Sequence, residues 1–570
     1  MLNVENFLQE RYPTFWEKRP LLARPLAKIL RLLFHEKEFH QFEETYPHLQ
    51  GFDFVEQALD YFQFSYSTRD RERERIPVRG RVIIVANHPI GSLDGLALLK
   101  LVREVRPDVR VIANDILTAI KPLHPLLLPV DNMGGHTPRR HLEAIQRHLK
   151  EDGALIVFPA GEVSRLGPQG VRDGKWRTGF LRMAVAGSAP VLPIYIDGRN
   201  SAFFYALSFL ARPVSTLWLV REMFKQARNC VPLRIGEPVS YESYHRVGVS
   251  LKEKAQLFRR HVYRLGQDRS GIFATESAIA HPENRALLRE EIRRCEWLGE
   301  TGDGKQIYLY HYRQPDSCIM REIGRLREMA FRAVGEGTGQ RRDTDGYDRH
   351  YFHLILWDDS DLEIAGAYRI GDAAETAQTM GQGHLYSASL FRFEPAMKPY
   401  LERGLELGRS FVQPKYWGKR SLDYLWYGIG AFLRRHPQYR YLFGPVSLSN
   451  TYPRPALEML VHFYSVNFPS LQRLATPCLP FAIAPPRRDE LDALFPGQNY
   501  RDEFLQLKSA LSHMDLSVPT LYKQYSELCE PGGVQFAGFN VDPAFGDCVD
   551  GLIIVDLARL KPSRRQRYIG

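Results

Sequence analysis

Alternation of aliphatic runs with helical stretches restricts the fold of the N-terminal half more than any other feature of this sequence. β-Branched and aliphatic runs occupy residues 81–86, 109–113, 154–158 and 191–196, and helical patterns occupy 94–105 and 141–151. Each run has the length and composition of a buried strand. Repeated alternation of strand and helix is typical of a layered α/β architecture, which we therefore expect here.

The length of the chain indicates two domains. At 570 residues it exceeds the size at which single hydrophobic cores stop growing. A polar, charged stretch at 241–295 is the candidate boundary between a domain at 1–275, with its core at 75–240, and a domain at 276–570, with its core at 295–485. Strand-like runs then return at 306–312, 351–357, 364–370, 386–393, 404–412 and 441–444. They predict an α+β fold for the second domain.

Charge and cysteine usage restrict the classes of partner and compartment. The net charge of +10 suits nucleic acid, anionic lipid or an acidic protein. The sequence has no zinc-finger spacing, aromatic RNP-type strand or basic-leucine-zipper run, so we expect no nucleic-acid partner. The six cysteines form no CxxC pair and no zinc-ligand pattern, which favours a reducing, cytosolic compartment and no metal site. Residues 1–7 lack a signal-peptide pattern, and we expect neither secretion nor import.

Two segments are candidates for docking on a membrane surface. Residues 19–40 place leucines and Phe34 along one helical stripe, with arginines and lysines on the remaining surface. Such a basic amphipathic helix lies in the headgroup region of a bilayer, although a helix packed on a soluble core has the same pattern. Residues 202–220 are the most apolar stretch, but Arg212-Pro213 divides it into pieces too short to span about 30 Å of hydrocarbon. It is a monotopic dock or a pair of buried core segments.

His88 and Asp94 are the candidate catalytic pair of the N-terminal half. They lie six residues apart in ANHPIGSLDG, between an expected strand and an expected helix. A neutral histidine oriented by a carboxylate can accept the proton of a hydroxyl that attacks a thioester. The alternative is a buried histidine with a satisfied hydrogen bond beside an aspartate that caps the helix.

Two further motifs follow in order: FPAGEVSR at 158–165 and APVLPI at 189–194. With Asn87 to Asp94, they resemble the NHxxxxD, FPEGxxS and VP-type motifs of the glycerophosphate and lysophosphatidate acyltransferase superfamily over about residues 75–240. The resemblance implies that His88 is a general base and Asp94 its orienting carboxylate. It also implies that the acceptor is bound by Phe158, Gly161, Glu162, Ser164 and Arg165.

The sequence departs from that family pattern in two ways. Five residues separate His88 from Asp94 where the family usually has four, so the loop must bulge for the pair to meet. Ala160 stands where the family has a glutamate, and Val163 where it has the arginine that helps to hold the acceptor's phosphate. The change suggests an acceptor without phosphate, unless Arg165 compensates. The same variant resembles a hemolysin-like subgroup that acylates lyso-ornithine lipid.

The second half contains motifs around residues 327–332, 342–348, 366–369 and 405–412. In that order they resemble the amino-acid N-acyltransferases that make ornithine lipids and, more distantly, the acyl-homoserine-lactone synthases, both of GNAT type, over about residues 295–485. An ammonium must lose a proton before it attacks a thioester, and Glu406 is the first candidate for the base. Candidate ligands of the amino acid are Asp343, Asp345 and Asp348 for its cationic ends, and Arg342, Arg369 or Arg409 for its carboxylate. The alternative is a solvated acidic turn and a surface Glu406–Arg409 pair.

The expected carrier-binding segment is Lys415, Gly418, Lys419 and Arg420. GNAT enzymes cradle the carrier's pyrophosphate in a glycine-rich turn before a helix, but this segment keeps one glycine. A donor without pyrophosphate, such as acyl carrier protein, therefore fits better than coenzyme A. Acyl carrier proteins are acidic, so one is a candidate partner for the surplus of Lys and Arg, and anionic lipid is the other candidate.

The pairing of the two halves resembles the bifunctional ornithine lipid synthases: an α/β acyltransferase domain followed by an α+β GNAT-like domain. The resemblance implies that the second domain transfers a 3-hydroxyacyl group to ornithine and the first then acylates the hydroxyl of the lyso-ornithine lipid. We expect no metal or redox cofactor, and a peripheral location on the cytoplasmic face of the inner membrane. The alternatives are the same chemistry on another amino acid such as glycine, a lysophospholipid acyltransferase with an accessory second domain, and a membrane-bound interaction or pore-forming protein.

Overall fold

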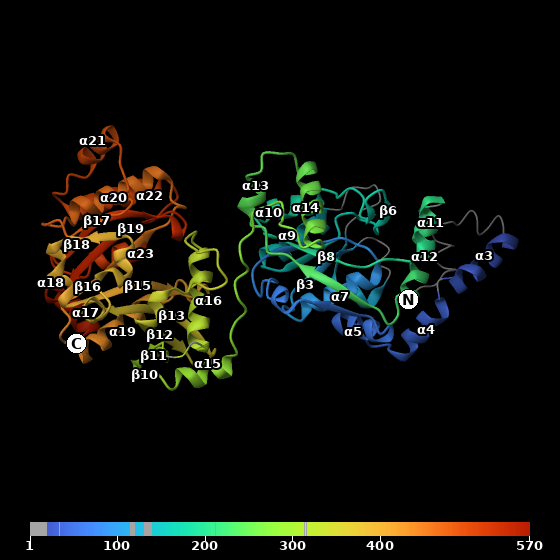
Figure 1. The fold of residues 1–570 in the computed structure, drawn as a ribbon, viewed down its shortest axis with the longest axis horizontal. Coiled ribbons are helices and arrows are strands. Elements are labelled where there is room, and N and C mark those ends of the chain that lie inside the picture. Colours follow the sequence, from blue (N-terminus) through green and yellow to red (C-terminus); the bar gives the residue numbers. More distant parts are fainter. Residues whose placement is uncertain are drawn as a thin grey trace. The chain divides into compact units, whose positions relative to one another are not determined.

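The computed structural model describes residues 20–33, 35–113, 120–129, 139–210, 212–312, 314 and 316–570. The chain forms two compact units, Met1–His281 and Pro282–Gly570 (Figure 1). The first seven residues, on which the expectation about secretion rests, lie outside the described residues.

A seven-stranded sheet forms the centre of the first unit. Its strands are β1 (Ser65–Thr68), β2 (Val82–Ala86), β3 (Val109–Ala113), β4 (Leu127–Pro129), β5 (Ala154–Val157), β8 (Val191–Ile196) and β9 (Cys230–Ile235). Their order is β1-β9-β8-β2-β5-β3-β4, and all neighbours are parallel except β8 and β9. The four strands expected from the sequence are thus confirmed to within one residue at each end.

Helices cover both faces of this sheet, which is why its central strands β2 and β5 are aliphatic throughout. Val82 and Ile84 of β2 face a core shared with α5 (Gly51–Tyr61) and α7 (Ser92–Arg103). Ile83 and Val85 face the opposite core. The helices on that side are α9 (Arg139–Lys150), α10 (Gly179–Ala186) and α14 (Leu251–Leu265). The expected α/β class is confirmed.

The expected helix over 19–40 is two helices. In the described residues α3 spans Pro20–Leu33 and α4 spans Glu36–Thr45. His35 between them adopts a left-handed conformation (φ 49°) that turns the chain; Phe34 lies outside the described residues. The apolar 202–220 segment is likewise divided at its Arg-Pro pair, into α11 (Ala202–Leu210) and α12 (Arg212–Lys225). Nowhere in the described ranges is a helix both long and apolar enough to cross a bilayer.

The first unit has further short elements. They are α6 (Asp70–Arg73), a 3-10 helix at Lys121–Leu126, the hairpin strands β6 (Arg165–Gly167) and β7 (Gly170–Arg172), and α13 (Tyr241–His245). The β6–β7 hairpin follows the FPAGEVS motif directly, so it leads the chain from that motif to residue 173.

An eight-stranded sheet forms the centre of the second unit. In spatial order its strands are β10 (Glu296–Glu300), β11 (Gln306–His311), β12 (Phe352–Asp358), β13 (Glu363–Asp372), β15 (Gly404–Val412), β16 (Tyr441–Leu448), β19 (Cys548–Asp556) and β18 (Val534–Asp542). Neighbours are antiparallel except β15 and β16, which are parallel.

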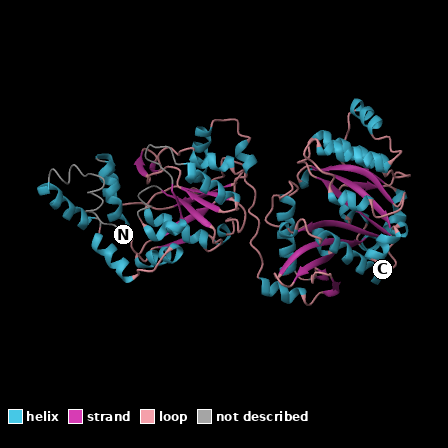
Figure 2. Cartoon of the chain, turned by 180° about the vertical axis from the view of Figure 1, so that it is seen from behind, coloured by secondary structure: helices cyan, strands magenta, loops and turns pink. Residues whose placement is uncertain are grey.

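Helices flank this sheet too (Figure 2). Leu354 and Leu356 of β12 face the core beneath α19 (Ser421–Arg435), α20 (Arg454–Asn467), α22 (Tyr500–Ser512) and α23 (Thr520–Ser526), whereas Ile355 and Trp357 face α16 (Cys318–Arg332). The remaining elements are α15 (Arg285–Ile292), α17 (Ala373–Thr379), α18 (Lys398–Glu402), α21 (Pro485–Leu494), α24 (Pro562–Tyr568) and the strand pair β14 (Phe391–Phe393) and β17 (Ala475–Pro477). The expected α+β class is confirmed.

One expected strand is mostly wrong. Of residues 386–393, only Phe391–Phe393 is a strand, and Tyr386–Ser389 is a 3-10 turn. The main-chain N–H groups of Tyr386 and Ser387 donate to the carboxylate of Glu406 rather than to a neighbouring strand. A side chain from a distant strand thus binds the backbone groups that a sheet ladder would have used.

Candidate active sites

His88 and Asp94 meet at the carboxyl end of the central strand β2. His88 follows the strand in the loop, and Asp94 is the third residue of α7. The Nδ1 atom of His88 lies 2.9 Å from the Oδ1 atom of Asp94. Asp94 is fully buried, whereas 20% of the His88 side chain is exposed. The pair is thus open to a substrate only through the histidine.

The loop between His88 and Asp94 bends at Gly91. Its φ of +119° is a conformation that glycine adopts without strain. The Oδ2 atom of Asp94 accepts hydrogen bonds from the main-chain N–H groups of Ile90 (2.8 Å) and Gly91 (3.2 Å). One oxygen of Asp94 therefore holds the loop while the other faces the histidine.

The environment of His88 favours its charged form. Burial alone would lower its pKa, but the carboxylate of Asp94, with a smaller contribution from Asp173, raises the pKa above the usual value. The ring of Phe158 packs on the imidazole with 4.2 Å between ring centroids. The Nε2 atom makes no hydrogen bond to any residue in the described ranges, which leaves it available to accept a proton.

The FPAGEVSR segment divides into an outer part and an inner part. Gly161 adopts a left-handed conformation (φ 71°), and Glu162 beside it is exposed. Ser164 is buried, and its hydroxyl donates to Asp173 rather than pointing outward. Arg165 donates to the hydroxyl of Ser208 (2.6 Å). The acceptor-binding roles expected for these residues stay predictions, but the position of Ser164 favours a structural part in the site.

Two asparagines connect the loop that carries His88 to strand β8 and to the segment that follows it. The motif resemblance implied no role for either asparagine. The amide group of Asn87 donates to the C=O of Ile196 (2.9 Å) and accepts from its N–H (2.7 Å). Asn200 donates to the carbonyl groups of Pro89 and Ile90, at 3.2 Å each. Asn87 belongs to a motif, so the sequence offered a signal for it; for Asn200 it offered none.

In the second unit, a cavity opens where the two parallel strands diverge. β15 and β16 pair in register from Gly404↔Tyr441 to Glu406↔Phe443, and the pairing then stops. The cavity is lined by Leu407–Val412 from β15 and Leu442–Ser447 from β16. The facing edges of the two strands beyond this point therefore have backbone groups that no ladder between them uses.

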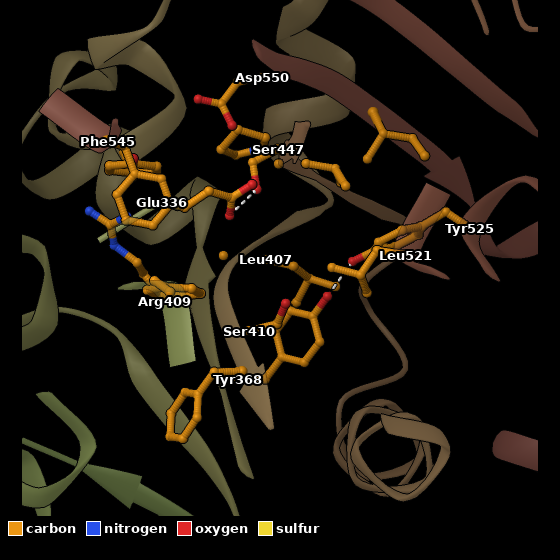
Figure 3. A pocket seen from close by; sticks show the side chains of 18 of the residues that line it. Glu336, Tyr368, Leu407, Arg409, Ser410, Ser447, Leu521, Tyr525, Phe545 and Asp550 are labelled. Carbon is orange, nitrogen blue, oxygen red and sulfur yellow. Dashed lines mark hydrogen bonds between the residues drawn. The ribbon is translucent and has the colours of Figure 1, made fainter. Parts of the chain in front are cut away.

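One end of this cavity is acidic (Figure 3). Glu336, Ser447 and Asp550 gather there, with Arg409 and Phe545 beside them, and Tyr368, Ser410 and Tyr525 line the opposite end. Glu336 accepts a hydrogen bond from Ser447 (2.9 Å). Burial raises the pKa of Glu336 to about 7, and burial together with Asp542 and Glu336 raises the pKa of Asp550 to about 8. Such an end suits a cationic ligand, which would stabilise the ionised carboxylates.

Arg409 supplies the positive charge of the cavity. It lies at an irregularity where the pairing of β13 with β15 shifts, and its φ is +49°. Its guanidinium group lies 3.5 Å from Asp343 and 3.7 Å from Asp345. The structure therefore brings three of the predicted amino-acid ligands together, and of these three Arg409 lines the cavity.

The other predicted ligands, Arg342, Asp348 and Arg369, do not line the cavity. Arg369 is buried and donates to Asp345 (2.6 Å) and Asp348 (3.1 Å), and Arg327 donates to Asp348 (2.8 Å). Arg342 pairs with Glu283 at 2.9 Å. The substrate-binding roles of Arg342, Asp348 and Arg369 stay predictions, and their ion pairs favour a structural part.

Glu406 does not line the cavity. It is buried on the opposite side of β15 from Leu407, where it accepts hydrogen bonds from the hydroxyl of Tyr351 and from the main-chain N–H groups of Tyr386 and Ser387. Glu336 and Asp550, which do line it, were missed. No local motif joins them, and Asp550 lies beyond the core expected at 295–485.

The expected carrier-binding residues lie at the surface near the end of β15. Lys415 pairs with Asp361 and Glu363, at 2.9 Å each, and Arg420 pairs with Asp423 at 3.4 Å. The ammonium group of Lys419 lies 5.2 Å from the centre of the Tyr416 ring, and Gly418 has a φ of 73°. Within the described part of the chain, no group of three or more His, Cys, Asp or Glu side chains is placed to hold a metal ion.

Comparison with known proteins assigns both halves. The family described as "Acyltransferase" matches residues 9–270, and the family described as "Acetyltransferase (GNAT) domain" matches residues 326–427.

Three relatives are named for three different acyl transfers. A glycine N(alpha)-acyltransferase of Phocaeicola vulgatus is 31% identical over 305 residues, which are 51% of this chain and 92% of that protein. A lyso-glycine lipid O-acyltransferase of the same species is 26% identical over 272 residues, 46% of this chain and 95% of that protein. An L-ornithine N(alpha)-acyltransferase of Brucella abortus is 30% identical over 285 residues, 45% of this chain and 92% of that protein. This chain therefore belongs to the acyltransferases and joins an acyltransferase domain to a GNAT domain.

Proposed function

We propose that this chain makes a phosphate-free diacylated aminolipid by two successive acyl transfers. The second unit transfers a 3-hydroxyacyl group to the α-amine of an amino acid, and the first unit then acylates the 3-hydroxyl of that product. The observation that carries the proposal is the presence, in one chain, of a His–Asp pair at 2.9 Å and of an acid-lined cavity between diverging strands. Relatives whose names describe N-acylation and lyso-lipid O-acylation support the pairing.

In the first unit His88 is the general base. Its Nε2 atom accepts the proton of the 3-hydroxyl as the oxygen attacks the thioester carbonyl; a C–O bond forms and the C–S bond breaks. The imidazolium then returns the proton to the departing thiolate. Asp94, fixed at Nδ1, stabilises the transient positive charge.

An acceptor without phosphate agrees with the interior of the FPAGEVSR segment. Ala160 and Val163, which replace the charged residues of the family pattern, are both buried. Val163 packs against Phe204 and Tyr205 rather than facing a ligand. The arginine that in the family helps to hold a phosphate thus has no counterpart at this position.

In the second unit we assign the base to Glu336 in place of Glu406. A base must lie within reach of the ammonium proton that it accepts, and Glu336 lines the cavity whereas Glu406 does not. With a pKa of about 7, Glu336 can accept the proton at neutral pH. The free amine then attacks the thioester; a C–N bond forms, the C–S bond breaks, the second proton that the nitrogen loses passes to the departing thiolate, and Glu336 returns the first to solvent.

The diverging strands suit the amide-containing arm of a pantetheine thioester. Backbone groups of an unpaired strand edge bind extended ligands through main-chain hydrogen bonds. Acyl carrier protein is our proposed donor, since its acidic surface is complementary to the net charge of +10. Lys419, at the surface beyond β15, is a candidate contact for it.

Ornithine is the proposed amino acid and glycine the second candidate. The cavity has two carboxyl groups, of Glu336 and Asp550, and one guanidinium group, of Arg409, which matches a substrate with two amines and one carboxylate. Glycine, with a single amine, would leave one of these carboxyls without a cation. Glycine remains a candidate because the relatives' names divide between the two amino acids. Asp550→Asn should lower kcat/KM for ornithine about tenfold while that for glycine stays within twofold.

We also propose that the protein binds anionic membranes peripherally, on the cytoplasmic face of the inner membrane. Its proposed products are lipids, and α3 carries exposed Ile29 and Leu32 among basic side chains. A basic amphipathic helix of this kind binds the headgroup region through apolar burial and electrostatic attraction.

Mass spectrometry of lipids tests the whole proposal. The chain is expressed in a host that lacks phosphorus-free aminolipids, beside the double variant His88→Ala/Glu336→Gln as the matched control. We expect a new diacylated lipid with an ornithine fragment in the first host only. A glycine fragment would favour the second candidate, a newly acylated phospholipid would favour a lysophospholipid acyltransferase, and unchanged lipids would contradict the proposal.

A further inference from the structure

Asp173 is a buried carboxylate that no motif includes. It follows the β6–β7 hairpin and is only 2% exposed, so a substrate has no access to it. Its Oδ1 atom accepts hydrogen bonds from the main-chain N–H of His88 (3.2 Å) and from the hydroxyl of Ser164 (2.5 Å), and its Oδ2 atom accepts from the indole N–H of Trp176 (2.8 Å). Three donors from three separate segments thus converge on one side chain.

The main chain of His88 is held on both sides by this arrangement. Its N–H donates to Asp173, and its C=O accepts a hydrogen bond of 2.7 Å from the N–H of Ser164. Because Ser164 is itself bonded to Asp173, the three residues form a closed set of hydrogen bonds around the backbone of the base. Asp94, in contrast, contacts the imidazole ring and the loop after it.

Asp173 is in turn anchored to helix α14. Its N–H donates to the hydroxyl of Tyr263 (2.7 Å), and its C=O accepts from the guanidinium group of Arg259 (2.6 Å). Arg259 also lies over the Tyr263 ring, 5.6 Å from its centre. The position of the His88 backbone is therefore tied to a helix that packs on the sheet rather than to the loop alone.

We propose that Asp173 is a positioning residue for O-acyl transfer, which holds the backbone of His88 in place through Ser164 and its own carboxylate. The inference rests on the proposed function of the first unit. Two oriented contacts are needed to fix a base: Asp94 sets the direction of the ring, and Asp173 sets the place from which the ring projects. The longer loop between His88 and Asp94 makes the second contact necessary, since a loop with an added residue and a glycine turn has more backbone freedom to lose. The Ser164 hydroxyl then serves the base rather than the acceptor.

Substitutions at Asp173 test the inference with synthetic lyso-lipid and an acyl donor. Asp173→Ala removes all three acceptor contacts, and displacement of a catalytic group by about 1 Å costs about 100-fold, so we expect kcat to fall about 10- to 100-fold with KM within twofold. Asp173→Asn keeps an oxygen for His88 and Ser164 but turns its amide toward Trp176, so it should recover part of the loss. Ser164→Ala should reduce kcat less than Asp173→Ala, and its effect should be less than additive with that of Asp173→Asn.

Glu72→Gln is the matched control. Glu72 is an equally buried carboxylate of the same unit that pairs with Arg234 and with the N–H of Ile235, and it contacts none of the site residues. It should lower the thermal midpoint without lowering kcat.

Four outcomes would each overturn the inference: wild-type kcat in Asp173→Ala, a rise in KM alone, an equal loss of kcat in Asp173→Asn and Asp173→Ala, or an equal loss of kcat in Glu72→Gln. If Asp173→Ala fails to fold, the Asn variant and Ser164→Ala still decide it. Wild-type protein that leaves the lyso-lipid unchanged would refute the proposed function instead.

Discussion

The two sites reach a working base by opposite physical means. In the first unit a carboxylate in direct contact raises the pKa of His88 against the effect of burial. In the second unit burial itself raises the pKa of Glu336, and the neighbouring Arg409 and Ser447 only moderate the rise. A fixed charge partner keeps the pKa of a base nearly constant when the substrate enters. The pKa of a buried acid, in contrast, depends on what fills the cavity. The two sites should therefore respond differently to substitution and to pH.

The largest effect on rate should come from the His88–Asp94 pair of the first unit. His88→Ala removes the one side chain, among the described residues, that contacts Asp94 and can accept the hydroxyl proton, and loss of a general base costs about 10²–10⁴-fold in rate. N-acylation should continue, so lyso-lipid should accumulate in cells. Chromatography of labelled lipids measures both products. Normal amounts of diacylated lipid in this variant would refute the role of the pair.

In the second unit, the same substitution at Glu336 and at Glu406 compares a proposed base with a structural carboxylate. Glu336→Gln should reduce N-acylation about 100-fold, at the low end for a general base because solvent also deprotonates part of the amine population. Glu406→Gln should instead lower the free energy of unfolding by about 1–3 kcal/mol, since it disturbs a buried acceptor of three hydrogen bonds. Rates at saturating amino acid and thermal unfolding separate the two effects. If Glu406→Gln abolishes N-acylation in a stable protein and Glu336→Gln does not, our assignment of the base is wrong and the sequence-based one is right.

The same contrast explains what the sequence predicted. His88 and Asp94 lie within one strand–loop–helix unit, so a short motif contains the whole pair, and the fold class follows from strand and helix periodicity. Asp173, Glu336 and Asp550 reach their sites through the tertiary fold, and no spacing in the sequence joins them to their partners. Glu406 was chosen because its type and its motif suited the chemistry. The bulge near Arg409 interrupts the alternation of side chains along β15, so strand periodicity does not reveal on which side Glu406 lies relative to the cavity-lining residues beyond the bulge.

The pH dependence of the two transfers should differ in a way that identifies each base. The deprotonated form of Glu336 is required, so N-acylation should fall about tenfold per pH unit as the pH drops below about 7. O-acylation requires neutral His88. Because the pKa of His88 is raised, the acid limb of the pH–rate profile should lie at a higher pH than for an ordinary histidine. Asp94→Asn removes the partner that raises this pKa, so the limb should move to lower pH while the maximal rate falls about tenfold, less than in His88→Ala. Rates of each transfer from pH 5 to 9, about the range in which both groups titrate, measure these limbs. An unmoved acid limb in Asp94→Asn would mean that another group than His88 controls it.

The smallest expected effect concerns the membrane surface rather than either site. Leu32 on α3 is 84% exposed, and transfer of a leucine side chain into the apolar boundary of a bilayer is worth about 1.5–3 kcal/mol. Leu32→Ala removes most of that side chain, and a single side chain seldom inserts completely, so binding to anionic vesicles should weaken about three- to tenfold. Leu471, which is 96% exposed in the second unit, provides the control: Leu471→Ala should leave binding unchanged.

Sedimentation with vesicles containing anionic lipid, at low and high salt, measures the affinity. Salt should weaken the electrostatic part of the binding, which the basic side chains contribute. Both transfers on detergent-dispersed substrates should stay at wild-type rates in Leu32→Ala, because Leu32 is exposed and is not among the described residues of either site. Equal binding by Leu32→Ala and wild type would exclude α3 as the docking segment and leave the 202–220 segment as the candidate.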